Sequence, residues 1–136
     1  MLETMMLSIS SKSVVVPKGK YVLGDPCYVV PNDDWSDLLD SCNYFNHPVG
    51  RVRDFNILGF GTKWGDGCYR DTKGNVYPVD AGLIGLVPIA YAEVEPDSVI
   101  VSFSEPTLCQ NDDGILKFGS YVIDTVLVDD EEENDE

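Results

Sequence analysis

The sequence predicts a mainly β protein, an antiparallel barrel or sandwich of about eight strands with one short helix at about residues 33–42. Three observations indicate this class. Short β-branched and alternating apolar runs are separated by turn-forming residues along most of the chain. The 12 glycines and 8 prolines suit many short strands better than long helices. Only one segment has the spacing of an amphipathic helix.

The first elements are short and extended. Residues 13–16 form a β-branched run that ends at Pro17, as expected of an edge strand. Residues 20–23 resume the extended pattern, and Gly24-Asp25-Pro26 then breaks it, because Pro26 lacks an N–H and holds Asp25 out of the helical region. Residues 27–30 are predicted to form a further strand.

The helix prediction rests on the spacing of four apolar side chains. Trp35, Leu38, Leu39 and Cys42 stand at i, i+3, i+4 and i+7, so they share one face of a two-turn helix. An Asn or Asp side chain among residues 32–34 is expected to cap its N-terminus, where the acids also match the helix dipole.

The rest of the chain is predicted to be loops and strands. The clearest prediction is a hairpin, because the turn at 72–75 contains Lys-Gly-Asn, which supplies the positive φ angles of a tight reversal. The predicted elements are a loop at 43–50, a bulged strand at 52–60, hairpin strands at 68–71 and 76–79, a buried strand at 80–88, strands at 98–103 and 115–118 around a turn cluster at 110–114, and a final strand run at 119–128.

The chain is long enough for one domain, which we place at residues 1–128. The formal net charge is -15, and seven of the 24 acids lie in residues 129–136, which we expect to be a disordered acidic tail. Direct binding to nucleic acid is not expected, because such binding neutralises phosphates with Lys and Arg. A protein with a basic surface is the expected kind of partner, which would be a host protein under the resemblance given below.

The sequence contains no signal peptide pattern and no apolar run long enough to cross a membrane. We therefore expect a cytoplasmic protein without membrane attachment. Its four cysteines include no C-x-x-C pair, so we expect reduced thiols and neither a metal site nor a cofactor.

One motif occurs twice. Gly24-Asp25-Pro26-Cys27-Tyr28 is followed by a close copy at Gly65-Asp66-Gly67-Cys68-Tyr69. If the two copies are neighbouring strand ends, the carboxylates of Asp25 and Asp66 and the thiols of Cys27 and Cys68 converge, with Asp80 as a third acid. These five residues are the candidate catalytic residues.

The candidate residues allow four interpretations. Thiolates and carboxylates could bind zinc, although histidine is usual in such sites and His47 is the only one here. Paired carboxylates could act as acid and base in a small hydrolase. A cysteine nucleophile would need His47 as its base. The interpretation we favour is structural, with each Asp accepting backbone N–H groups in a turn and each Cys entering the core.

A second set of candidates could bind a ligand such as a small nucleotide. Arg51 and Arg53 would point the same way from one strand and could hold a phosphate or carboxylate. Trp64, next to Gly65, could stack on a ring, and Tyr69 lies in the second copy of the motif. We therefore list Arg51, Arg53, Trp64 and Tyr69 as ligand-binding candidates.

The order of motifs resembles a group of uncharacterised small proteins of bacteria and tailed bacteriophages. The likeness spans about residues 21–125 and rests on GDPCY at 24–28, Trp35 with Leu38 and Leu39, GDG and Tyr69 at 65–69, VDAG with IG at 79–85, and FG with IDT at 118–125. It implies a cytoplasmic setting and a phage origin. The resulting hypothesis is a non-enzymatic binding protein that sequesters or inhibits a host component, with a small hydrolase or a nucleotide-binding pocket as the alternative.

Overall fold

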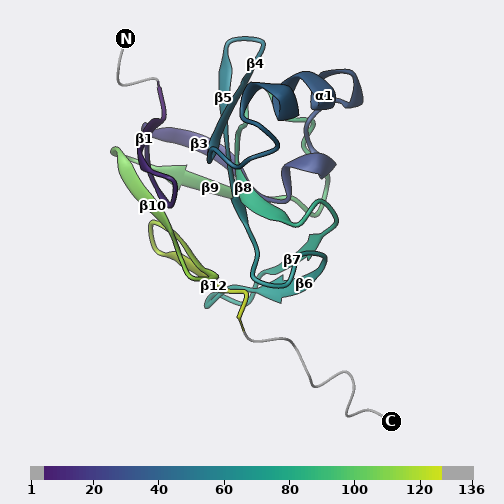
Figure 1. The fold of residues 1–136 in the computed structure, drawn as a ribbon. Helices are drawn as coiled ribbons and strands as arrows, with labels where there is room; N and C mark the ends of the chain where they lie inside the picture. The colour runs from purple at the N-terminus through teal and green to yellow at the C-terminus, as the bar shows by residue number, and fades with distance from the viewer. Residues whose placement is uncertain (1–4, 127–136) are drawn as a thin grey trace.

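The computed structural model describes residues 5–126, which form twelve strands, one α-helix and a short 3₁₀ helix (Figure 1). All strand pairs are antiparallel, so the predicted mainly β class is confirmed. The sheets do not close into a barrel and instead form a sandwich. The predicted acidic tail at 129–136 lies outside the described residues.

Two five-stranded sheets and one hairpin make up the β structure. The first sheet has the order β1 (Leu7–Ser10), β2 (Ser13–Val16), β10 (Thr107–Asp112), β11 (Ile115–Phe118) and β12 (Tyr121–Asp124). The second has the order β4 (Val49–Val52), β5 (Phe55–Gly61), β8 (Leu83–Pro88), β3 (Gly19–Gly24) and β9 (Val99–Phe103). The hairpin consists of β6 (Gly67–Arg70) and β7 (Val76–Val79).

The main core lies between the two sheets. The period of two along a strand sends Tyr21 and Leu23 of β3 into this core and Val22 to the opposite face. Phe118 of the first sheet meets Phe60 of the second with their ring centroids 5.9 Å apart. The hairpin adds Tyr69, Tyr77 and Val79 and so covers one end of the core.

A second core lies on the other face of the second sheet, where helix α1 (Asn32–Ser41) packs (Figure 1). The helix approaches the sheet closely at Gly50, where an added Cβ would lie 2.6 Å from Cδ1 of Leu38. Gly59 leaves space for the ring of Phe45 in the same way, since a Cβ added at Gly59 would lie 2.9 Å from that ring. The molecule therefore has three layers, sheet, sheet and helix.

Several sequence predictions are confirmed. The helix lies within one residue of the predicted bounds, and the four apolar side chains of its predicted face join the second core. The hairpin around residues 72–75 and the strands at 13–16, 20–23, 98–103 and 115–118 are present, with small differences at their ends. Only the second part of the run at 80–88 is a strand, and it is buried as predicted.

The predicted strand at 27–30 is wrong, because residues 26–28 form the 3₁₀ helix η2 (Pro26–Tyr28). Pro26 occupies its first turn, where its fixed φ suits a helix start and its missing N–H is not needed. Asp25 caps this helix through its side chain, which accepts a hydrogen bond from the N–H of Cys27. The motif therefore turns the chain instead of extending it.

The predicted strand at 52–60 is confirmed for most of its length by β5, but the predicted bulge is wrong, because the segment begins in the β4–β5 hairpin turn. The chain reverses at Arg53 and Asp54, whose φ angles are +49° and +70°. Neither residue is a glycine, so composition did not mark this turn. The turn also places Arg53 at the hairpin tip, away from the strand position that would align it with Arg51.

The remaining differences concern strand number and ends. β1, β4 and β10 were not predicted, and the described residues form twelve strands where about eight were expected; β4 begins within the predicted loop at 43–50. Part of the predicted turn cluster at 110–114 extends β10, and the final strand of the described chain is only β12. The expected side-chain cap of α1 is absent, because Pro31 holds the N-cap position. Within residues 5–126 no helix is long and apolar enough to cross a bilayer.

Candidate functional site

The first copy of the motif is tied to the turn that precedes β8. One carboxylate oxygen of Asp25 accepts the N–H of Cys27 at 3.0 Å. The other accepts the N–H groups of Asp80 and Ala81 at 2.8 and 2.7 Å. Asp25 is 3% exposed, so these three donors surround a buried carboxylate. The carboxylate of Asp25 therefore holds two chain segments together, and Asp25 and Asp80 are 55 residues apart in the sequence.

Cys27, Tyr28 and Asp80 lie beside that carboxylate. Partial burial, together with the charges of Asp25 and Asp80, raises the pKa of the Cys27 thiol to about 12. Partial burial and the same two acids also raise the pKa of the Tyr28 hydroxyl. A cysteine nucleophile needs a lowered pKa, so this environment opposes the nucleophile interpretation of Cys27.

The second copy of the motif has different surroundings. Asp66 and Cys68 are exposed, whereas Tyr69 is buried in the main core and donates its hydroxyl to the carbonyl of Gly65 at 3.1 Å. Gly65 lies against the turn before β8, since a Cβ added at Gly82 would be 3.6 Å from its Cα. The structure therefore gathers Asp25, Cys27 and Asp80, and leaves the Asp66 side chain facing solvent.

An open cavity of about 370 Å³ begins at the buried carboxylate of Asp25. Its wall contains the half-exposed Tyr28, the buried Tyr77 and apolar residues of β3, β7 and β9. Glu95 and Asp97 stand exposed in the loop before β9 and add two acids to the lining. The lining contains no lysine or arginine.

The loop that carries these acids is ordered by its own hydrogen bonds. The hydroxyl of Ser98 accepts the N–H of Glu95 at 2.9 Å, and the N–H of Ser98 donates to the carbonyl of Glu95 at 3.0 Å. Pro96 between them restricts the backbone further. The two carboxylates are therefore presented from a closed turn.

The ligand-binding candidates from the sequence lie on separate elements. Arg51 is in β4 and lies 3.7 Å from the carboxylate of Asp54. Trp64 is 58% exposed, and its indole N–H donates to the carbonyl of Val126 at 2.8 Å. Arg53 forms an ion pair that is described next. None of these three lines the cavity beside Asp25.

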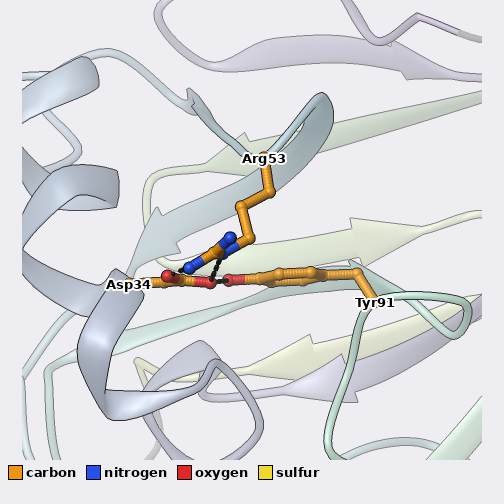
Figure 2. Close-up of polar contacts among 3 residues, drawn as sticks. All are labelled: Asp34, Arg53 and Tyr91. Atoms are coloured by element: carbon orange, nitrogen blue, oxygen red, sulfur yellow. Dashed lines mark hydrogen bonds and ion pairs between the residues drawn. The ribbon is translucent and has the colours of Figure 1, made fainter.

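An ion pair between the exposed Arg53 and the buried carboxylate of Asp34 joins the hairpin of β4 and β5 to α1 (Figure 2). Nε of Arg53 donates to both carboxylate oxygens of Asp34, at 2.9 and 2.8 Å, and the hydroxyl of Tyr91 donates to one of them at 2.7 Å. These bonds lower the pKa of Asp34. The pKa of the Tyr91 hydroxyl is raised, mainly by burial and also by its hydrogen bond to Asp34. The sequence signal was an acid in the first helical turn, which we assigned to the dipole.

A third buried carboxylate, that of Asp71, organises the hairpin of β6 and β7. Asp71 accepts the N–H groups of Lys73 and Asn75 at 2.8 and 2.9 Å and the hydroxyl of Tyr77 at 2.6 Å. Burial favours its neutral form, but these bonds together with the amide of Asn75 outweigh it, so the pKa of Asp71 is lowered. An Asp that starts a hairpin turn is the signal that could have identified this role.

No group of three or more His, Cys, Asp or Glu side chains in the described part of the chain could hold a metal ion. Comparison of the chain with protein-family models, with curated proteins and with solved structures found no match. What the site can do is therefore inferred from its own residues.

Proposed function

We propose that the chain is a binding protein that holds a basic segment of a partner protein in the cavity beside Asp25. The single observation behind the proposal is the lining, which combines apolar and aromatic walls with acids and lacks any base. A lysine or arginine side chain has the matching character, an apolar stem with a cationic end. The ring of Tyr28, which is 44% exposed, offers a face on which such a cation is attracted.

The state of Asp25 favours binding over hydrolysis. A general acid or base must be able to exchange a proton with a substrate, yet both oxygens of Asp25 already accept backbone N–H groups. Asp66, the second carboxylate of the hydrolase hypothesis, faces solvent on another element. Asp80 lies beside Asp25, but because both oxygens of Asp25 are occupied, this pair offers only one carboxylate for proton transfer, and acid–base hydrolysis uses two.

The charge of the whole chain supports a cationic partner. Its formal net charge of -15 attracts basic surfaces over a distance of about 10 Å at moderate ionic strength. In the setting that the resemblance to small bacterial and phage proteins implies, the partner is a host protein that the chain sequesters or inhibits. Binding in the cytoplasm without membrane attachment is part of the same proposal.

The test is titration of the full chain with a short arginine-rich peptide, followed by calorimetry and by NMR of the Tyr28 and Tyr77 rings. We expect binding that weakens as salt rises, with shifts of both rings. The double variant Glu95→Gln and Asp97→Asn should weaken binding about tenfold, because it removes two charges from the lining.

The matched control carries Asp37→Asn and Asp40→Asn, which remove two exposed acids from α1 and change the net charge by the same amount. This control should bind almost as well as the original chain. Equal weakening by both double variants, or binding without any shift of the two tyrosine rings, would mean that the cavity is not the binding site.

A further inference from the structure

Strand β9 is an edge of the second sheet, with β3 as its single neighbour among the described strands. Its side chains Val99, Val101 and Phe103 point toward the main core, and Val101 is 1% exposed. Ile100 and Ser102 point to the other face, where α1 does not cover them, and Ile100 is 40% exposed. Within residues 5–126, one side of β9 is therefore open to another strand.

The strand register identifies which backbone groups face that open side. Ile89 donates its N–H to the carbonyl of Lys20 at 3.0 Å, so the N–H and C=O of Lys20 point toward β8. Successive residues of a strand alternate, hence Tyr21 points its backbone groups toward β9 and bonds with its register partner Val101. The N–H and C=O groups of Ile100 and Ser102 consequently point outward.

Residues 99–103 themselves carry none of the usual protections against strand addition. Edge strands are commonly blunted by charged side chains, proline or a bulge. β9 reads Val-Ile-Val-Ser-Phe and pairs with β3 over five consecutive residues without a register shift. Strand addition to such an edge is a recognised way to bind an extended peptide.

Open space and negative charge mark both ends of β9. The cavity beside Asp25 reaches Val99 at one end, and Asp97 lines it. A second open cavity of about 440 Å³ reaches Phe103 at the other end, and Glu105 lines that one. Lys20, opposite Ser102, is the one base in the neighbouring strand β3. An added strand would therefore meet an acid at each end.

The same charges disfavour a second copy of this chain as the added strand. Antiparallel pairing of two β9 edges through the outward groups joins Ile100 of each copy to Ser102 of the other, with Val101 at the centre. In that register Asp97 of each copy stands opposite Glu105 of the other. Like charges directly opposite each other are destabilising.

We propose that β9 binds an extended segment of a basic partner protein by β-strand addition, with the outward N–H and C=O groups of Ile100 and Ser102 forming the new ladder. Lysine or arginine side chains at the ends of the segment pair with Asp97 and Glu105. The proposal rests on the proposed function for the basic character of the partner. It adds the conformation of the bound segment and the backbone groups that hold it.

The test measures amide hydrogen exchange by NMR with a short peptide of alternating valine and threonine that carries lysines at both ends. In the free protein we expect the N–H groups of Val101 and Phe103 to be protected and those of Ile100 and Ser102 to exchange fast. Bound peptide should slow exchange at Ile100 and Ser102. Ser102→Pro, which removes one outward donor, should weaken binding about tenfold, whereas Ser102→Ala should leave it nearly unchanged.

Binding that shifts Tyr28 and Tyr77 but leaves the Ile100 and Ser102 amides fast would overturn strand addition and leave the proposed function standing. A peptide with glutamates at its ends could also bind as tightly and slow exchange at Ile100 and Ser102. That result would support strand addition but contradict the proposal that the partner is basic. Protection of both amides without any peptide, together with a doubled molar mass, would identify a second copy as the occupant. The amide measurement uses the unmodified chain, so it does not depend on the folding of Ser102→Pro.

Discussion

Asp25 and Asp66 hold the same place in two copies of one motif, yet one carboxylate is buried and the other is exposed. The residue that follows each Asp differs. Pro26 starts η2 and turns Asp25 back onto the N–H of Cys27, whereas Gly67 has a φ of +153° and opens β6. Burial then differs because the turn before β8 supplies two further N–H groups to Asp25 only.

These surroundings predict different costs for the same substitution. Asp25→Ala leaves three backbone N–H groups without their acceptor, and we expect it to lower the free energy of unfolding by about 2–4 kcal/mol. Asp66→Ala is the matched control and should change it by less than about 0.5 kcal/mol. Urea unfolding measures both. Similar values for the two variants would contradict a structural role specific to Asp25.

Asp71 predicts how stability responds to acid. Its folded pKa lies below the ordinary value of 3.8, so the ionised form stabilises the fold at neutral pH. This contribution is present above 3.8 and is lost as the pH falls through the lower folded value. Asp71→Asn should cost about 1–3 kcal/mol at neutral pH and flatten the acid limb of the stability curve.

The measurement is the urea midpoint as a function of pH. Asp113→Asn is the control, because Asp113 is exposed and asparagine tolerates its positive φ of +56°. It should leave the acid limb unchanged. An acid limb equally steep in Asp71→Asn and the original chain would assign acid unfolding to other carboxylates.

At the scale of elements, the hairpin of β4 and β5 is held by its tip. Arg53 and Asp54 both have positive φ, a conformation that favours glycine in a two-residue turn. Arg53 offsets this conformation by pairing with the buried Asp34 of α1, so one side chain connects the hairpin to the helix layer (Figure 2). Asp54 is exposed and lies 3.7 Å from Arg51, a contact of small value at a surface.

Glycine at these two positions should therefore have opposite effects. Asp54→Gly relieves the backbone and removes little, so we expect unfolding free energy to rise by up to about 1 kcal/mol. Arg53→Gly relieves the same strain but leaves the Asp34 carboxylate with Tyr91 as its remaining partner, and it should lower stability. Thermal unfolding of the two variants distinguishes them. If both stabilise the protein, the ion pair does not hold α1 to the hairpin.

Sequence signals identify the elements that neighbouring residues determine and miss the features that depend on contacts far along the chain. Periodicity identified α1, a β-branched run ending at a proline identified β2, and turn chemistry identified the hairpin at 72–75, because these signals are local. The turn at Arg53 was missed because its positive φ angles depend on a partner far along the chain. The cavity acids Glu95 and Asp97 were missed for the same reason, since only the fold brings their loop to Asp25.

For the molecule as a whole, the unpaired edge of β9 and the negative charge act together. A flat apolar edge promotes self-association, and the chain has few bases to offset its acids. In the register centred on Val101, two Asp97–Glu105 contacts would repel at the ends of the paired strands. We infer that these acids keep two copies apart while leaving the edge available to a basic strand.

Reversing the charge at position 97 should therefore change the oligomeric state. Asp97→Lys places a lysine opposite Glu105 at both ends of the self-paired strands, so two repulsions become two attractions, and we expect dimers at concentrations where the original chain is monomeric. Sedimentation equilibrium measures this change. Adding Ser102→Pro should restore the monomer, because it removes an outward donor from each edge. The control Asp37→Lys alters the net charge equally but lies on α1, so dimers of that variant would trace association to net charge and away from β9.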